Sequence, residues 1–384
     1  RNSAGQVVPT QEFTATATLP RAYGQISLGY KDTYFLEGTG SVDKSSNLPS
    51  GNNVYFYPSI SGSVVLSNLI NQDWLSFLKV RGNWAQVGKT TDNFRLIDTQ
   101  NIKNLYNGIP IVDPNSYKNN PNLKPERSTE VEVGMEARFL NNRVGFDVSL
   151  YKTNSKDQIL LVPISGASGY TSKWFNAGEL ENKGIEVQLN LVPVKNENFR
   201  WDMNWNWAIN KNKVLSLNEG MTNLQLGRAV NDVTFNAPAG EAYGQIWGTD
   251  YVYSPEGERI VDPNTGKYMI TTSKTNVLGN IMPQYTWSVR NSITYKAFTF
   301  TFLIDGQQGG SVFSGDMLYG TDTGIYPETL AIREPGAILP GVVMQNGQYV
   351  QNNVPIKTMS GSLLRTGNYE EKDFLYDSSF IKLR

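Results

Sequence analysis

Three segments of the sequence combine aromatic side chains with one another or with carboxylates at short spacing. They contain Trp174 and Phe175; Trp247, Asp250 and Tyr251; and Tyr319, Asp322 and Tyr326. Flat rings that stack on a sugar, beside carboxylates that accept hydrogen bonds, are a chemistry suited to carbohydrate recognition. These residues are therefore candidate substrate contacts. The same aromatic groups could instead pack loops against one another or contact a protein partner.

Other chemistries are excluded by composition. The chain has no Cys and no His, so disulfides, thiolate metal sites and zinc hydrolases are ruled out, as are Ser-His-Asp and Cys-His enzymes. Carboxylate pairs of the glycosidase type remain, but the sequence does not show which of the 35 acidic residues would pair. We therefore expect that the protein is not an enzyme, and we assign no catalytic residue.

The segment DPNTGKY, residues 262–268, resembles the start of a calcium-binding loop. It lacks the later ligands and the bidentate Glu of such a loop, so a turn built by Asp262, Asn264 and Gly266 is the better interpretation. We expect no metal and no cofactor.

The composition is typical of a β-rich protein. Of the 384 residues, 18% are charged and 11% are aromatic, and the net charge of -1 gives no basic footprint for a nucleic acid. No apolar run is long enough for a transmembrane helix. A mean hydropathy of -0.38 does not exclude a membrane barrel, because half of each barrel strand is polar.

The segment WDMNWNWAIN, residues 201–210, shows the elements that would position the candidate residues. Trp201, Trp205 and Trp207 fall on one face of an extended chain, and the intervening Asp and Asn residues fall on the other. This period of two predicts a strand. The alternation does not show whether the apolar face of this strand packs in a core or contacts lipid.

The clearest hairpin joins alternating segments at 131–139 and 144–151. Asn141 and Asn142 lie between them, and Asn tolerates the left-handed conformation that tight turns require. Similar pairs lie at 22–30 and 34–43, 54–70 and 74–87, 184–194 and 199–212, and 285–295 and 298–308. The sequence predicts about eleven or twelve strands, of which these five pairs and the start of a strand in the final segment, 373–384, account for eleven.

Short links within these pairs alternate with long links between them. The long links are 44–53, 88–127, 158–183, 213–284 and 309–373. Two further extended segments, 241–254 and 266–272, would form a hairpin inside an external excursion. Before the strand at 185–191, Gly178 and residues 182–184 are predicted to form turns. Short turns at one end and long loops at the other are typical of an outer-membrane barrel.

Strand length also favours a barrel over a β-sandwich, since 9 to 14 residues suit a tilted bilayer crossing. Aromatic residues crowd the strand ends, where interfacial girdles would lie. The polar face would then line the lumen, with Glu132, Glu136, Arg138, Asp202, Asn204, Asn206, Arg290 and Asp305. We predict an all-β fold, an antiparallel transmembrane β-barrel with short periplasmic turns and long extracellular loops.

Four motifs in order resemble one known family. They are PNLKPERSTEVEVGMEARFLNNRVGFDVSLYKTNSKDQIL (121–160), NAGELENKGIEVQL (176–189), PQYTWSVRNSITYKAFTFTFLIDGQQGG (283–310) and DSSFIKLR (377–384). From about Tyr23 to Arg384, the chain resembles the C-terminal barrel part of SusC/RagA-type TonB-dependent outer-membrane transporters of Bacteroidetes.

The resemblance implies a 22-stranded barrel closed by a plug, of which residues 1–384 would supply about eleven or twelve strands. The loops 213–284 and 309–373 would be extracellular. Plug, TonB-contacting segment and closing strands are expected before Arg1 and after Arg384. The implied function is TonB-driven import of an oligosaccharide or peptide through the outer membrane, with a SusD-like surface lipoprotein as partner and lipid around the barrel. No nucleic acid is expected.

Two other functions fit part of the pattern. A soluble secreted β-protein that binds or hydrolyses carbohydrate would use the same aromatic and acidic residues. A passive porin would share the fold. The sequence does not distinguish glycan from peptide as cargo.

Overall fold

The computed structural model describes residues 14–70, 72–107, 109–332, 336–356 and 369–384. The chain divides into two compact units. Unit 1 comprises Arg1–Val64, Arg81–Val131 and Thr153–Glu179, and unit 2 comprises Val65–Val80, Glu132–Lys152 and Leu180–Arg384. Within the described residues, no helix is long and apolar enough to span a membrane.

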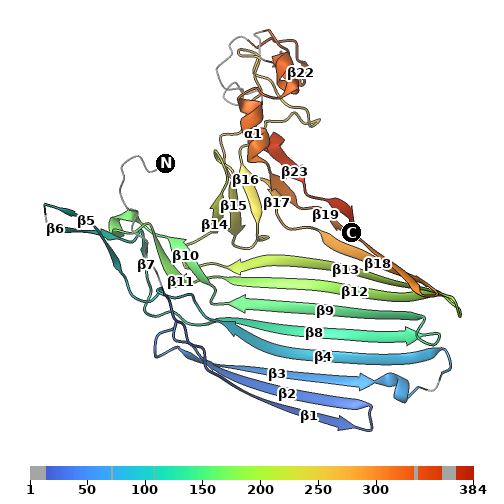
Figure 1. Ribbon diagram of the computed structural model, residues 1–384. Helices are drawn as coiled ribbons and strands as arrows, with labels where there is room; N and C mark the ends of the chain where they lie inside the picture. Colours follow the sequence, from blue (N-terminus) through green and yellow to red (C-terminus); the bar gives the residue numbers. More distant parts are fainter. Residues whose placement is uncertain (1–13, 71, 108, 333–335, 357–368) are drawn as a thin grey trace, which may run out of the picture. The chain divides into compact units, whose positions relative to one another are not determined.

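Long antiparallel strands form a sheet of eleven in the described chain, which confirms the predicted fold class (Figure 1). In sheet order the strands are β1 (Arg21–Tyr30), β2 (Tyr34–Lys44), β3 (Val54–Val65), β4 (Leu75–Lys89), β8 (Glu126–Phe139), β9 (Val144–Lys156), β12 (Glu179–Lys195), β13 (Phe199–Ser216), β18 (Tyr285–Tyr295), β19 (Phe298–Gln308) and β24 (Phe380–Leu383). The five predicted hairpins supply ten of these strands, and β24 is the eleventh.

Tight turns close the hairpins through residues in the left-handed conformation. Asn141 and Asn142 have φ of 57° and 63°, as the sequence predicted, and Lys296 between β18 and β19 has φ of 51°. Since the strands follow one another as antiparallel neighbours, successive connections fall at alternate ends of the sheet. We call the ends the turn end and the long-loop end.

The register of β13, β18 and β19 keeps the two faces separate. Trp205 lies opposite Val289, which lies opposite Ile304 on the apolar face. Gly306 leaves room on this face for the ring of Trp287, because an added Cβ would lie 2.7 Å from that ring. Phe300, also on this face, remains 65% exposed within the described residues. The described residues therefore leave this part of the apolar face uncovered.

The start of β12 corrects one predicted turn. Gly178 has φ of 98°, but β12 begins at Glu179, so residues 182–184 lie within a strand. The ring of Tyr151 occupies the space that a Cβ of Gly184 would need. Glycine is placed there for close packing rather than for a turn.

Small sheets and short helices occupy the long connections. In unit 1 these are β5 (Gln100–Tyr106), β6 (Ile109–Pro114), β7 (Tyr117–Lys118), β10 (Ile159–Pro163), η2 (Gly166–Ser168) and β11 (Ser172–Asn176). Strand β10 pairs with β11, which pairs with β7. The buried residues Leu48, Tyr55, Leu123 and Ile159 form a core beside them.

Unit 2 carries more extensive additions. They are β14 (Asn223–Arg228), β15 (Thr234–Pro238), β16 (Gln245–Gly248), β17 (Asn276–Asn280), β20 (Ser311–Phe313), α1 (Gly315–Asp322), η3 (Pro327–Ile332), β21 (Val342–Gln345), β22 (Gln348–Gln351), η4 (Glu371–Phe374) and β23 (Leu375–Asp377). The short helix η1 (Leu66–Asn68) lies instead in the short connection between β3 and β4. Strands β14 to β17 form a sheet within the predicted excursion. The predicted extended segments there meet as a single bridge between Tyr251 and Ile270, beyond β16.

Candidate functional site

The polar face of unit 2 forms a wall of linked amides. The Asn204 side chain donates from Nδ2 to Asn190 Oδ1 at 2.5 Å, and Asn206 Nδ2 donates to Asn204 Oδ1 at 2.8 Å. Asn206 also donates to Ser288 Oγ at 3.3 Å. We call Asn190, Asn204, Asn206 and Ser288 the amide wall. Strand alternation places these groups together, and no charge is needed to satisfy them.

The charged residues predicted for this face each have a local partner or lie in the open. Glu136 accepts two hydrogen bonds from Arg138 at 2.6 and 3.0 Å. Asp202 pairs with Arg200 at 2.6 Å. These pairs neutralise one another along a strand, so they add little net charge to the wall.

Glu132 and Asp305 are also bonded on the same face. Ser149 donates to Glu132 at 3.0 Å, and Arg384 pairs with Asp305 at 2.7 Å. Arg290 is exposed and lies opposite Asn204 in the register. The structure thus places Arg290 beside the amide wall.

The aromatic pair predicted in unit 1 lies on β11 and is half-buried. The Arg95 guanidinium stacks 3.7 Å from the Trp174 ring centre, and Tyr117 meets the same ring edge-on at 6.5 Å. The indole N–H of Trp174 is buried without an acceptor among the described residues. The Lys173 ammonium lies 4.7 Å from the Phe175 ring. Both rings contact cations, and Trp174 also packs against the unit 1 core.

The remaining predicted aromatic groups are spread through the additions of unit 2. Trp247, on β16, donates from its indole to Gln245 at 2.8 Å. Tyr319 lies on α1 and is 55% exposed, while Asp322 ends that helix. Tyr326 packs over Gly320. Of these groups, Tyr319 is the most accessible to a ligand or partner.

Tyr251 is placed quite differently, since it belongs to a buried core and is 2% exposed. Its hydroxyl donates to Asp373, and the Arg259 guanidinium lies 3.9 Å from its ring centre. Arg259 also pairs with Asp373 at 2.7 Å. Burial raises the pKa of the Tyr251 hydroxyl, and the charge of Asp373 raises it further. Tyr251 is therefore a neutral donor that fixes Asp373.

Asp250 has a partner from the same distant segment. Lys372 Nζ pairs with Asp250 at 2.8 Å and donates to the Tyr253 hydroxyl at 3.1 Å. Burial works to lower the pKa of Lys372, but the hydrogen bonds to Asp250 and Tyr253 outweigh it, and the pKa is raised. Lys372 is thus held as a cation.

Two buried carboxylates meet beside this pair. Thr249 Oγ1 lies 2.7 Å from Glu370 Oε2 and is also hydrogen-bonded to Glu371. A hydroxyl has one proton to donate, so it cannot donate to both carboxylates at once. Burial raises the pKa of Glu370 to about 7. A protonated Glu370 can supply the second hydrogen bond.

We call these residues the loop cluster. Its members are Thr249, Asp250, Tyr251, Tyr253, Arg259, Glu370, Glu371, Lys372 and Asp373. Asp250 and Tyr251 were predicted from the sequence as candidate contacts, whereas Arg259 and the run 370–373 were not. That run of four charged residues, EEKD, was the available signal. Its partners lie more than a hundred residues earlier, and no local pattern identifies them.

The predicted turn at DPNTGKY is present. Asp262 accepts from the backbone N–H of Asn264 at 2.9 Å and from the Thr265 hydroxyl at 3.0 Å. Gly266 has φ of 76°, and the carbonyl of Pro355 occupies the place of a Cβ. In the part of the chain that the structure describes, no group of three or more acidic residues is arranged to hold a metal ion.

Comparison with known proteins gives a consistent picture. Residues 2–335 match the family described as TonB dependent receptor-like, beta-barrel. TonB-dependent receptor P26 of Formosa agariphila is 29% identical over 326 residues, which cover 76% of this chain and 32% of that protein. TonB-dependent receptor SusC of Bacteroides thetaiotaomicron is 23% identical over 399 residues, covering 97% and 38%. The chain thus spans about a third of the length of these relatives.

A solved structure agrees with the fold. The structure of the RagAB peptide transporter superposes with a TM-score of 0.75 at 17% identity, covering 95% of this chain and 40% of that chain. At this identity the likeness concerns the arrangement of strands.

Proposed function

Because the chain belongs to the family of TonB-dependent receptor β-barrels, and within it to the SusC/RagA type, we propose that it is part of an importer of oligosaccharides or peptides. The protein lies in the outer membrane, as barrels of this family do. The soluble secreted β-protein considered from the sequence is therefore set aside. The family comprises receptors and transporters rather than catalysts.

The observation that carries the proposal is the separation of the two sheet faces. One face exposes apolar side chains such as Phe300, and the other carries the amide wall. Lipid tolerates only the first surface, whereas a hydrated lumen requires the second. The amide wall offers neutral donors and acceptors, which match hydroxyl groups of a glycan or peptide groups equally well. Hydrogen bonds between neutral groups are also weak enough for a bound cargo to dissociate and pass along the lumen.

The additions at the long-loop end would recognise the cargo outside the cell. We propose that the loops 213–284 and 309–373 are extracellular and that Phe175, Trp247, Tyr319 and Asp322 contact cargo. Trp174 would position Phe175 through β11. Asp250 and Tyr251 would act indirectly, because the loop cluster already uses their polar groups.

Partners follow from the same family resemblance. For the whole transporter we propose a plug, energy supplied through TonB, and a SusD-like surface lipoprotein. The exposed face of α1, with Tyr319, is accessible for contact with that lipoprotein or with cargo.

Growth of a strain lacking the gene tests the proposal. We expect the deletion strain to lose growth on one nutrient class, offered either as oligosaccharide or as peptide, and the intact gene to restore it. Tyr319→Ala should reduce uptake of that class, while Tyr295→Ala at the turn end should not. Normal growth of the deletion strain on every oligosaccharide and peptide mixture would reject the proposed import.

A further inference from the structure

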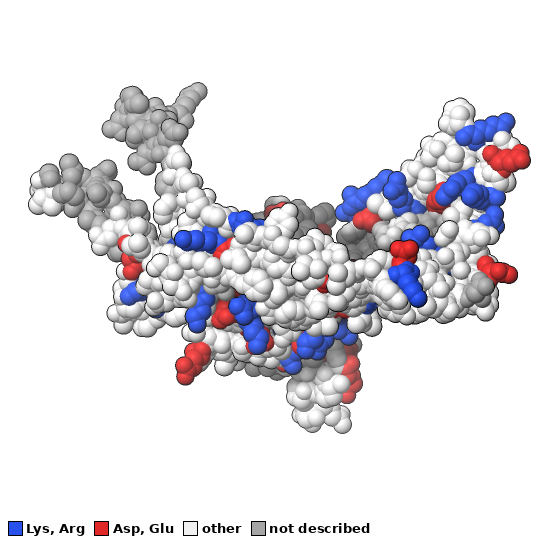
Figure 2. Space-filling model, turned by 90° about the horizontal axis from the view of Figure 1, so that it is seen from below, with Lys and Arg blue, Asp and Glu red and all other residues white. Residues whose placement is uncertain are grey.

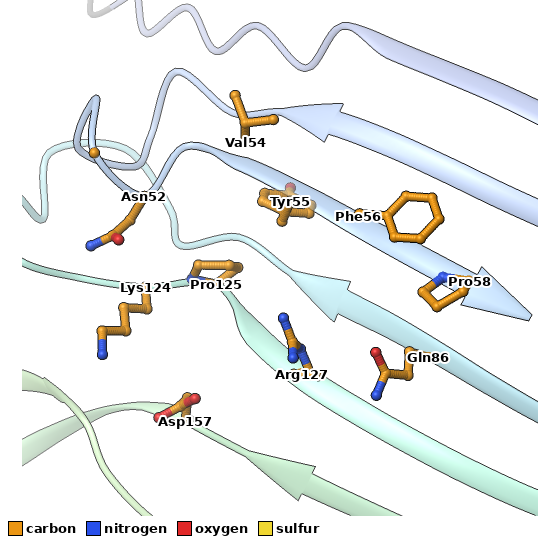
Figure 3. Close-up of a pocket in the computed structure, with 11 residues that line it drawn as sticks. Asn52, Val54, Tyr55, Phe56, Pro58, Gln86, Lys124, Pro125, Arg127 and Asp157 are labelled. Atoms are coloured by element: carbon orange, nitrogen blue, oxygen red, sulfur yellow. The ribbon is translucent and has the colours of Figure 1, made fainter.

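A cavity of about 530 Å³ lies within unit 1, near the long-loop end of β3, β4 and β8. Its lining includes Asn52, Phe56, Gln86, Lys124, Arg127 and Asp157 (Figure 3). This volume is in the range of small-molecule sites and exceeds what a lone inorganic ion fills. The cavity is separate from the loop cluster, which belongs to unit 2.

Three of the four β3 residues that line the cavity lie on the apolar face. Val54, Phe56 and Pro58 share this face with Ile60, which is 50% exposed, whereas Tyr55 comes from the other face. Arg127 shares its face of β8 with Val131 in the same way.

The charges in the cavity are not balanced. Within the described residues, neither Lys124 nor Arg127 has a carboxylate within ion-pair distance, and Asp157 is the single carboxylate of the lining. Lys44 lies opposite Val54 in the β2–β3 register and adds another cation nearby. By contrast, Lys156 pairs with Glu179 at 3.2 Å. The cavity therefore has unmatched positive charge, suited to an anion.

The apolar face of β8 changes character toward the long-loop end, from the exposed Val131 to Arg127 four residues earlier. A tilted barrel strand rises about 2.5 Å per residue along the membrane normal, so Arg127 stands about 10 Å beyond Val131. That height corresponds to the headgroup layer beyond the hydrocarbon core. Figure 2 shows one face of the molecule, on which blue and red side chains gather in groups with white surface between them.

We propose that this cavity binds the phosphate-bearing headgroup of an outer-leaflet glycolipid. Arg127 and Lys124 bind the phosphate, since guanidinium and ammonium groups form charge-assisted hydrogen bonds with it. Asn52 and Gln86 supply amides for the sugar hydroxyls. Phe56 and Pro58 continue toward Ile60 as an apolar track for an acyl chain. The inference rests on the membrane orientation in the proposed function.

Lipid retention by the whole transporter tests this site. The transporter is purified in mild detergent from its source cells, and native mass spectrometry measures binding of a monophosphorylated disaccharide lipid and of its dephosphorylated counterpart. We expect the phosphorylated lipid to bind at least about tenfold more tightly. The double variant Lys124→Gln, Arg127→Gln should abolish this preference. Arg143→Gln removes a positive charge at the turn end, away from the cavity, and should preserve the preference.

Equal binding of the two lipids, or an unchanged preference in the double variant, would overturn the proposal. Inorganic phosphate is tested separately, and its failure to displace the lipid at millimolar concentration supports a lipid ligand. Equal occupancy by inorganic phosphate alone would identify a soluble anion and reject the glycolipid. Protease resistance of each variant confirms folding, and Arg127→Lys, which keeps the charge, should retain binding. Nutrient uptake is measured in parallel, so a failed lipid site is distinguishable from a failed transport proposal.

Discussion

In the amide wall and in the loop cluster, polar side chains obtain their hydrogen-bond partners in different ways. In the wall, neighbouring strands bring neutral amides together at a fixed spacing, and the side chains stay partly exposed. In the loop cluster, Asp373 pairs with the partly exposed Arg259 and accepts a hydrogen bond from the buried Tyr251. The wall is therefore tolerant of single changes, whereas the cluster depends on each member, because a buried charge without a partner is costly.

The largest expected effect concerns the face opposite the wall. Trp205→Arg should lower the free energy of unfolding in lipid vesicles by about 2–4 kcal/mol, since it places a cation in the hydrocarbon layer. Asn204→Ser, on the wall, should change it by less than about 1 kcal/mol. Denaturant unfolding of the whole transporter measures both. Equal losses would mean that the two faces do not differ in environment.

Removing one member of the loop cluster should have a slightly smaller effect. Asp373→Ala leaves Arg259 without its carboxylate and Tyr251 without its acceptor, at a cost of about 2–3 kcal/mol to local stability. Amide hydrogen exchange of residues 245–270 should accelerate, while β18 and β19 keep their protection. Glu256→Ala, an exposed acid in the same region, is the control. Unchanged exchange in Asp373→Ala would show that the cluster does not hold the loop.

The cluster should also respond to pH, which the wall should not. The pKa of Glu370 is raised to about 7 by burial, so folding favours its protonated form. The resulting local stability is fully present below the unfolded pKa and is lost as pH rises through about 7. Hydrogen exchange of residues 245–270, corrected for intrinsic rates, should therefore accelerate between about pH 5 and 8. Glu370→Gln should remove this dependence, and its persistence would point to another group.

The smallest expected effect is on the wall itself. Asn206→Ala loses hydrogen bonds to Asn204 and Ser288, at a cost of about 0.5–1 kcal/mol because water can replace the lost partners. The Asn206→Ala variant should lose a larger fraction of its cargo uptake than of its free energy of unfolding. Unchanged uptake, with unchanged stability, would remove Asn206 from the cargo path.

The sequence predicted the strands well because a period of two is a local property. Trp201 to Asn210 lie within β13 as expected, and Asn141 and Asn142 form the turn that their conformational freedom allows. The start of β12 was misjudged, because the packing of Tyr151 over Gly184 is a contact between strands. Likewise, Tyr251 and Asp373 are 122 residues apart, so their hydrogen bond leaves no trace in either segment. The candidate residues were found by type, whereas their burial required the tertiary structure.

The position of the excursion between β13 and β18 has a consequence for how such a protein can change over generations. These strands are hydrogen-bonded neighbours, with Ala208 opposite Thr286, so the chain leaves and re-enters the sheet one strand apart. Closing a longer insertion there costs only about 0.6 kcal/mol per doubling of its length. New recognition segments can therefore be exchanged at this point while every register in the sheet is inherited unchanged.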